Sequence, residues 1–352
     1  MEQSTENLNE SDTPWAAERV IDCHLHERAN PDALIAHLDG SGVSSALVLA
    51  FTQFDEHFAR LREEHPGRVV AWARGAQLVD GSPAEDDPAG RLFSFGGPAG
   101  IIAPEVVRSE LAALRDDGWR GFAETAGPVE ADGPELQRVY ALAAELDVPV
   151  MMHFQETAAP GQPAYGIRGF RRIESMLKKF PSTRFVCHAP DFWGSIDVRY
   201  TDGGTYLTDA VSPGGLSDRL MSDYENMFGD LGAPSALLQL TRDEEFTAGF
   251  LDRHSEKLMF GSDCGCADGQ GMPTEGASWP MPAAGRDGET DVVELDAAAA
   301  AAMQSAMASL GGLARRCIAR ELLAVTWRAT TTEVFRRIAS DNAVRVYDLP
   351  RG

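Results

Sequence analysis

Two histidines one residue apart, His24 and His26, are the first residues of this chain whose types and spacing suggest chemistry. They follow the short apolar run 19–23, which predicts a β-strand. Because strand side chains alternate between two faces, both imidazoles point the same way at the end of this strand. Two imidazoles in that arrangement can bind one divalent ion such as Zn²⁺. A His-x-His pair is also common by chance, so the metal hypothesis depends on the other histidines and carboxylates.

Four further predicted strands end in a side chain that can bind a metal ion. Polar groups that face the centre of a barrel or sheet are costly if they stay unpaired, and a metal ion removes that cost. Chance could place one histidine at a strand end, whereas four histidines and an aspartate favour a metal site over a hydrogen-bonded polar core. The runs 119–124, 148–153, 183–188 and 257–263 end in Glu124, His153, His188 and Asp263.

The segments that must position these side chains alternate between apolar runs and helical patterns. Strands alternating with helices predict a mainly parallel sheet, and eight such units favour an α/β fold, a closed (β/α)8 TIM barrel with additional C-terminal helices. Active sites of such barrels lie at the C-terminal ends of the strands. The predicted strands are 19–23, 44–51, 69–74, 119–124, 148–153, 183–188, 226–231 and 257–263. The predicted helices are 31–38, 53–65, 106–117, 135–146, 169–180, 296–324 and 332–346, the last two covering the outside of the barrel.

The composition indicates one acidic globular protein with 352 residues, 43% hydrophobic content and a formal net charge of −23. We expect a loose acidic tail over 1–14 and a single barrel domain over 15–350. The negative field repels nucleic acid and anionic lipid, so neither is an expected partner. Because the tail lacks the basic start and apolar stretch of a secretory signal, we expect a cytoplasmic protein.

Five cysteines, an odd number without a CxxC motif, argue against a disulfide framework. Cys23 and Cys187 each precede a strand-end histidine and are expected to be buried, facing away from it. Cys264 and Cys266 could be metal ligands, but we expect loop packing because zinc–thiolate sites usually need more partners. Three more histidines lie in predicted helices and are expected on the helix surface: His37, His57 and His65.

Several segments taken together resemble the amidohydrolase superfamily, in the branch called amidohydrolase 2. They are VIDCHLH, VPVMMHF, RFVCHAPDFWG, NMFGDLGA, LMFGSDC and EVFRRIASDNAVRVYDL, and they span about residues 19–348. That branch includes aminocarboxymuconate semialdehyde decarboxylase, resorcylate-type decarboxylases and pyrone dicarboxylate lactonase. The resemblance implies that the metal ligands are His24, His26, His153 and Asp263. It also implies that His188 is either a general acid/base or a ligand of a second ion.

The chain departs from the binuclear relatives at one position. Those relatives carry a bridging carboxylated lysine, whereas here the fourth predicted strand ends in Glu124 and no lysine lies nearby. Glu124 could bridge two ions, or it could orient a ligand histidine by a hydrogen bond without binding the ion itself. We expect one divalent ion, Zn²⁺ before Mn²⁺, with two ions as the alternative.

The resemblance implies a metal-dependent hydrolase that uses a metal-activated water to cleave an ester, lactone or amide of a small carboxylate-bearing substrate. Asp263 would accept the proton of the water and pass it to the leaving group, and His188 would help to stabilise the oxyanion. The same groups could run decarboxylation of an aromatic or muconate-like acid, which is the alternative. A third hypothesis, a barrel that only binds or assembles, is disfavoured because these side chains are intact.

Substrate-binding candidates lie near the predicted strand ends. Arg74 and Arg168 could hold a substrate carboxylate, with a rim ion pair as the alternative role for Arg74. Trp193 could form an aromatic wall or simply pack. Asp230, on the seventh predicted strand, fits a structural or ligand-orienting role better than a ligand role. A homodimer is an expectation that rests on the resemblance alone, and specificity is expected in the loops 75–104, 189–222 and 264–295.

Overall fold

Eight parallel strands in sequential order, β1 to β8, form the framework of the protein. The computed structural model describes residues 13–28, 30–49, 55–74, 112–157, 166–271 and 316–351. The strands are β1 Ile21–His26, β2 Ser45–Leu49, β3 Val69–Arg74, β4 Trp119–Thr125, β5 Pro149–His153, β6 Arg184–His188, β7 Met227–Asp230 and β8 Leu258–Met259.

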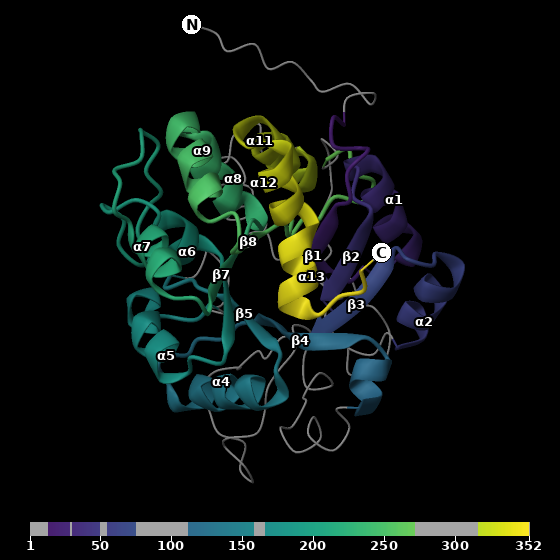
Figure 1. Ribbon diagram of the computed structural model, residues 1–352, viewed down its shortest axis with the longest axis horizontal. Coiled ribbons are helices and arrows are strands. Elements are labelled where there is room, and N and C mark those ends of the chain that lie inside the picture. The colour runs from purple at the N-terminus through teal and green to yellow at the C-terminus, as the bar shows by residue number, and fades with distance from the viewer. Residues whose placement is uncertain are drawn as a thin grey trace, which may run out of the picture.

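The first strand meets the segment that follows the last one, which nearly closes the sheet into a barrel. The amide of Cys23 donates to the carbonyl of Phe260 at 3.0 Å, and the amide of Asp263 donates to the carbonyl of His24 at 2.7 Å. Helices surround this ring of strands (Figure 1). The predicted TIM-barrel α/β fold is therefore confirmed, although β8 itself is only Leu258–Met259 and Asp263 lies beyond it.

The helices around the strands are segments of 5 to 13 residues. Prolines lie at the first turn of α1, α4, α6 and α8, where the missing amide proton costs nothing. The helices are α1 Pro31–Ser41, α2 Asp55–Glu64, α4 Pro134–Leu146, α5 Ile173–Lys179, α6 Pro190–Gly194, α7 Leu216–Asp223, α8 Ala233–Thr241, α9 Glu244–Arg253, α11 Ile318–Ala329, α12 Thr332–Arg336 and α13 Asn342–Tyr347. Residues 112–116 are also helical, and a π-helical segment, Arg337–Asp341, joins α12 to α13.

Four of these helices, α6 to α9, were not predicted from the sequence. The signals for two of them are local: Pro234 opens α8, and the Asp243 side chain caps α9 by accepting from the amide of Phe246 at 3.0 Å. Short helices rich in glycine and acidic neighbours give weak periodic patterns, so tertiary packing decides them.

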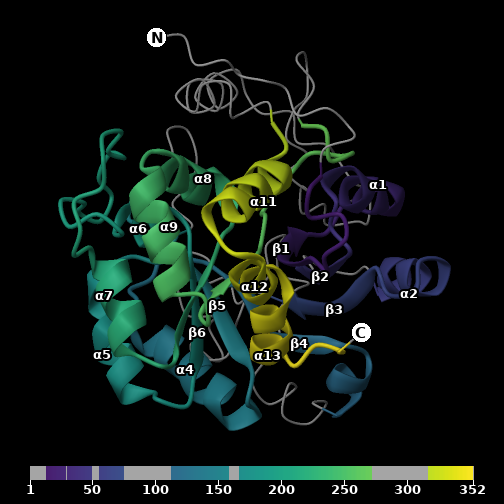
Figure 2. The same cartoon turned by 45° about the horizontal axis from the view of Figure 1, so that its top comes forward.

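The C-terminal helix α13 covers the N-terminal end of the barrel rather than its outside, where the sequence analysis had placed it. Val346 and Tyr347 belong to the same buried cluster as Met151 and Val186 inside the barrel. Figure 1 shows α13 crossing the centre of the ring of strands, and Figure 2 shows the same contact from a tilted view. The chain after α13 is held there because Arg120 Nε donates to the carbonyl of Asp348 at 3.1 Å. The opposite end of the barrel is left for the strand-end side chains.

Strand β1 is irregular, and this changes one predicted side-chain direction. Its pairing with β2 shifts register between Asp22 and Leu25. As a result Cys23 packs in the inner cluster beside Ile21, although His24 also faces inward. The prediction that Cys23 faces away from the histidine is therefore wrong, whereas Cys187 packs outside the barrel as expected.

Several predicted features lie outside the described residues. They are residues 1–12 of the tail, the loop 75–104, the segment 272–315 and the side chains of Arg74 and His57. Across the parts of the chain that are described, no helix combines the length and apolar character needed to cross a membrane.

Candidate metal centre

Six side chains from five different strand ends meet at the C-terminal end of the barrel; we call them the barrel-mouth cluster. They are His24 and His26 from β1, Glu124 from β4, His153 from β5, His188 from β6 and Asp263 after β8. The parallel register brings His153 and His188 directly opposite each other on β5 and β6. The cluster is more open on one side, because the side chains of His26 and Asp263 are 23% and 22% exposed while those of His24 and His188 are fully buried. A substrate would reach the cluster from the side of His26 and Asp263.

The Glu124 carboxylate lies between the four histidines. Its Oε1 atom is 2.5 Å from His153 Nδ1 and 3.7 Å from His188 Nε2. Its Oε2 atom is 3.5 Å from His26 Nε2 and 3.9 Å from His24 Nε2. Each carboxylate oxygen therefore faces one pair of histidines.

Asp263 supplies the second central carboxylate. Its Oδ1 atom is 3.3 Å from His26 Nε2 and 3.8 Å from His24 Nε2, and its Oδ2 atom is 3.7 Å from His188 Nε2. The residue adopts a left-handed conformation with φ of 47°, which aspartate tolerates better than most residues. The hydrogen bond from its amide to the carbonyl of His24 holds the residue against β1. Asp263 thus combines a fixed backbone with a partly exposed carboxylate.

Asp230, at the end of β7, orients two of the histidines from behind. It is fully buried, and its oxygens lie 2.7 Å from His24 Nδ1 and 3.0 Å from His188 Nδ1. An anionic carboxylate can only accept, so each imidazole carries a proton on Nδ1 and turns its Nε2 atom toward the cluster. The amide of Gly232 donates to the same carboxylate at 2.5 Å. This geometry agrees with the ligand-orienting role that the sequence suggested.

The charges in the cluster reinforce one another. Burial alone lowers the pKa of His188, but the Asp230 carboxylate outweighs it and holds that pKa well above its usual value. Burial also acts to lower the pKa of His26, yet hydrogen bonds to Asp263 and Glu124 raise it to about 9. The histidines in turn hold the pKa values of both carboxylates well below their usual range despite burial. Protons on these histidines and a divalent cation would compete for the same electron pairs.

The donor set fits a divalent metal ion. Three groups of three side chains each bring one ligand atom apiece to within 4.8 Å of one another. Within the described part of the chain, the buried Nε2 atom of His188 has no hydrogen-bond partner, which is costly unless another group such as a cation engages it. Imidazole with carboxylate suits Zn²⁺ and Mn²⁺. The groups are His24, His26 and Asp263; Glu124, His153 and His188; and His24, His188 and Asp230.

The predicted substrate-binding residues have different surroundings. Trp193 is fully buried on α6, and its Nε1 donates to the carbonyl of Asp230 at 3.1 Å, which corresponds to the packing alternative. Arg168 bonds to the carbonyl of Pro128 at 3.0 Å and pairs with Glu130. Arg74 is the last residue of β3, but its side chain lies outside the described residues. The role of Arg74 in substrate binding stays a prediction.

Comparisons with solved structures give distant matches along nearly the whole chain. A protein of Agrobacterium tumefaciens in its apo form matches with a TM-score of 0.47 and 11% identity, covering 95% of this chain and 95% of that one. A TatD homolog from Escherichia coli matches with a TM-score of 0.46 and 15% identity, covering 94% and 99%. A uronate isomerase from Bacillus halodurans matches with a TM-score of 0.41 and 11% identity, covering 91% and 69%.

None of the curated proteins matches the chain. A family model described as amidohydrolase matches residues 21–349, a span that includes every strand of the barrel and every member of the barrel-mouth cluster. The chain therefore belongs to the amidohydrolase 2 family.

Proposed function

We propose that this protein is a metal-dependent hydrolase that cleaves an ester, lactone or amide bond in a small carboxylate-bearing substrate. One observation carries the proposal: the Asp263 carboxylate, 22% exposed, lies 3.3 Å from His26 and within 3.8 Å of both His24 and His188. A carboxylate at the open edge of a buried histidine cluster can act on a water and a substrate that reach it from solvent.

His24, His26 and Asp263 would hold the ion, together with His153. A divalent ion bound there supplies Lewis acidity, which polarises a carbonyl group and lowers the pKa of water toward about 7. Asp263 would accept the proton of the attacking water and pass it to the leaving group. His188 Nε2 lies on the same side as this carboxylate, and with a proton on Nε2 as well, which its raised pKa favours, the imidazole would donate to the developing oxyanion. Asp230 keeps that imidazole in the required orientation.

The position of Glu124 bears on the number of ions. Each of its two oxygens faces one histidine pair, but Oε1 is hydrogen bonded directly to His153 Nδ1 at 2.5 Å, which leaves no space for an ion between these two atoms. This contact favours a single ion, with Glu124 orienting His153, over two ions bridged by Glu124. The number of metal ions bound at the barrel mouth of the purified protein tests this point. Ions that are bound elsewhere in the protein are subtracted from the total metal content.

The expectation that the substrate carries a carboxylate depends on Arg74. This residue ends β3 and therefore lies at the same end of the barrel as the cluster. A guanidinium at that position would hold a carboxylate through two parallel hydrogen bonds. Comparing each substrate with its uncharged ester or amide counterpart would measure how much the negative charge contributes to kcat/KM.

The chemical test follows the oxygen atoms. The metal-loaded protein is incubated in ¹⁸O-labelled water with a panel of lactones, esters, amides and aromatic or muconate-like acids. Hydrolysis incorporates one solvent oxygen into the product acid, whereas decarboxylation releases CO2 and incorporates a solvent proton at carbon. Solvent oxygen in the product supports the proposal. Release of CO2 without incorporation of solvent oxygen would replace it by the lyase alternative.

A further inference from the structure

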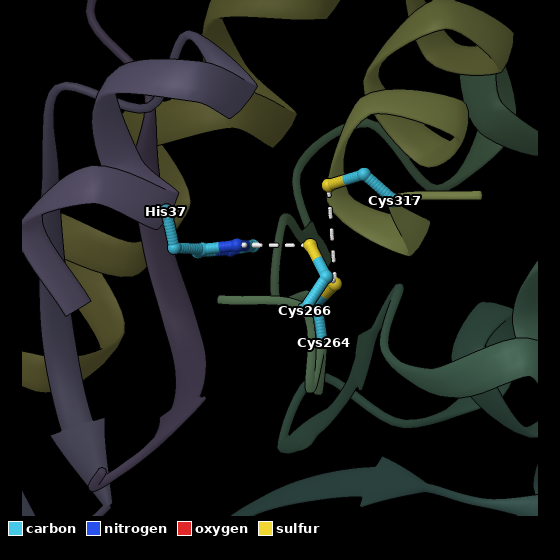
Figure 3. Close-up of side chains that lie close together, drawn as sticks. All are labelled: His37, Cys264, Cys266 and Cys317. Atoms are coloured by element: carbon cyan, nitrogen blue, oxygen red, sulfur yellow. Dashed lines mark hydrogen bonds between the residues drawn. The ribbon is translucent and has the colours of Figure 1, made fainter. Parts of the chain in front are cut away.

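A second group of potential metal ligands lies outside the barrel mouth, and it combines sulfur with nitrogen; we call it the sulfur cluster. It consists of His37, Cys264, Cys266 and Cys317, all buried. His37 comes from α1, Cys264 and Cys266 from the segment after β8, and Cys317 from the residue that precedes α11. Figure 3 shows the four side chains pointing toward one another from these three segments.

The prediction for His37 is wrong, whereas the prediction for the two cysteines left a ligand role open. His37 was expected on a helix surface, but it is fully buried. Cys264 and Cys266 could be ligands, but packing in a loop was favoured because zinc–thiolate sites usually need more partners. Folding supplies two more, one from 51 residues further along the chain and one from the first helix.

The distances match a tetrahedral ion site. The Sγ atoms of Cys264 and Cys266 are 3.4 Å apart, those of Cys264 and Cys317 are 3.9 Å apart, and Cys266 Sγ is 3.3 Å from His37 Nδ1. A zinc ion with sulfur ligands at about 2.3 Å and nitrogen at about 2.0 Å requires edges of about 3.8 Å between sulfurs and about 3.5 Å between sulfur and nitrogen. All four ligand atoms lie within 4.8 Å of one another. One ion at their centre could therefore reach each of them with only small adjustments.

The surroundings compensate the charge of such a site. Three thiolates with one neutral imidazole and Zn²⁺ carry a net charge of −1. The Arg28 guanidinium donates to the carbonyl of Cys264 at 3.0 Å and also to the carbonyl of Cys266, so a positive charge lies next to both ligands. Arg28 thereby fixes the backbone that presents two of the sulfurs. A buried anionic centre without a cation beside it would be much less favourable.

A disulfide is a weaker explanation of the same cluster. A disulfide joins two sulfurs and leaves the third thiol and the imidazole without a function. Here the three cysteines are free, and His37 Nδ1 lies against one of them. Among the described residues, His37 Nε2 has no hydrogen-bond partner, so the contact with Cys266 is what orients the buried ring.

We propose that His37, Cys264, Cys266 and Cys317 bind a structural zinc ion that joins α1, the segment after β8 and the start of α11. Three sulfurs and one nitrogen leave no open ligand position in a tetrahedral site, which is typical of structural rather than catalytic zinc. Cys264 directly follows Asp263, so the ion would also fix the segment that presents this carboxylate to the barrel mouth. The tight approach of α1 to the same segment fits this role, because a side-chain carbon on Gly40 would collide with the carbonyl of Asp268.

The first experiment uses the unmodified full-length protein, purified under reducing conditions and loaded with zinc. Its zinc X-ray absorption spectrum should contain sulfur neighbours at about 2.3 Å. Replacement of zinc by Co²⁺ should add a thiolate-to-metal charge-transfer band in the near ultraviolet. The barrel-mouth cluster offers only nitrogen and oxygen ligands, so both signals report on the sulfur cluster alone. Zinc with only nitrogen and oxygen neighbours would overturn the proposal, whatever the catalytic activity of the sample.

The second experiment separates the two metal sites by substitution. Cys317→Ser should abolish the charge-transfer band and remove about one zinc ion per chain. Asp263→Asn should keep the band, and so should Cys187→Ala, which changes a buried cysteine outside the cluster. A Cys317→Ser protein that keeps the full band would contradict the proposal.

A measurement on the unmodified protein covers the case in which Cys317→Ser does not fold. Titration with an organic mercurial should release zinc in step with the modification of three thiols. Denaturation of a separate sample, not treated with the mercurial and kept without reductant, should yield five reactive thiols, the number of cysteines in the chain. Two fewer thiols, together with no release of zinc, would show that a disulfide occupies this place instead and would refute the site.

Discussion

The barrel-mouth cluster and the sulfur cluster contain two adjacent residues of the chain, Asp263 and Cys264 respectively. The two clusters nevertheless differ in almost every physical respect. The first combines imidazoles with carboxylates, and two of its six side chains are more than 20% exposed. The second combines three thiols with one imidazole, and all four side chains are buried. Ligand type and access to solvent thus distinguish a site that a substrate can reach from a site that can only stabilise the fold.

The two regions also differ in how their ligands are supported. At the barrel mouth, a fully buried carboxylate, Asp230, orients two imidazoles by hydrogen bonds of 2.7 and 3.0 Å. In the sulfur cluster, the support comes from a guanidinium that binds backbone carbonyls. Orientation of ligand lone pairs matters for chemistry, whereas fixation of backbone segments matters for stability. Substitutions at the barrel mouth should therefore reduce turnover more than stability. Substitutions in the sulfur cluster should reduce stability more than turnover.

The largest effect is expected for Asp263→Asn. An amide cannot accept a proton from water at neutral pH, so kcat should fall by about 10²–10⁴-fold. The melting temperature and the thiolate-to-cobalt band should stay close to those of the wild type. Steady-state kinetics measures the first quantity, with Asp252→Asn on the exposed surface of α9 as the matched control. Full turnover by the Asp263 variant would remove the basis of the proposed function.

Asp230→Asn should have the next largest effect. The amide can accept from only one of the two imidazoles, so either His24 or His188 loses the hydrogen bond that turns its Nε2 atom toward the cluster. We expect metal affinity at the barrel mouth to fall by about 10–100-fold. Competition with a chelator measures this, while the sulfur cluster should keep its ion. Equal loss from both sites would instead indicate general unfolding.

Cys317→Ser should show the opposite pattern. Loss of an ion that joins three segments should destabilise the protein by about 3 kcal/mol, which lowers the melting temperature by about 4 °C in a domain of this size. Metal affinity at the barrel mouth should change much less than in Asp230→Asn. Calorimetry of this variant and of Cys187→Ala provides the comparison. An unchanged melting temperature would mean that the sulfur cluster does not stabilise the fold.

An ion-pair network on the protein surface, outside both clusters, provides a reference for the size of the effects on stability. Hydrogen bonds from Arg219 at 2.9 Å, Lys178 at 3.0 Å and Tyr224 at 2.8 Å lower the pKa of Glu174 from 4.5 to about 2. The stabilisation is complete above the unfolded pKa near 4.5 and is lost as the pH falls toward 2.

Because the network is partly exposed, we expect Glu174→Gln to cost only about 1 kcal/mol at pH 7. Denaturant unfolding of both proteins between pH 7 and pH 3 should show the difference shrinking as the pH falls. A difference that grows toward low pH would have the wrong sign for a depressed carboxyl pKa.

Local patterns predicted much of the barrel because each strand is a short apolar run that is buried on both faces. The alternation of strands and helices placed the C-terminal ends of β1, β4, β5 and β6 at one rim, and with them the histidines and Glu124. The pattern was weaker between β6 and β8, where four short helices escaped prediction. The direction of Cys23 also escaped, because a register shift in β1 depends on pairing with β2 rather than on the residues of β1.

The amino-acid sequence by itself determined which residues could bind a metal ion at the barrel mouth, since strand periodicity and the parallel barrel together send strand-end side chains to a common centre. Only the tertiary structure decided that Asp230 bonds to two imidazoles at once and that His37 and Cys317 join Cys264 and Cys266. Those contacts link positions between 42 and 229 residues apart through the packing of α1 and α11 against the segment after β8 and through the pairing of β7 with β6 in the barrel. No local period encodes such packing, because it follows from how whole elements fit together rather than from the spacing within any one of them.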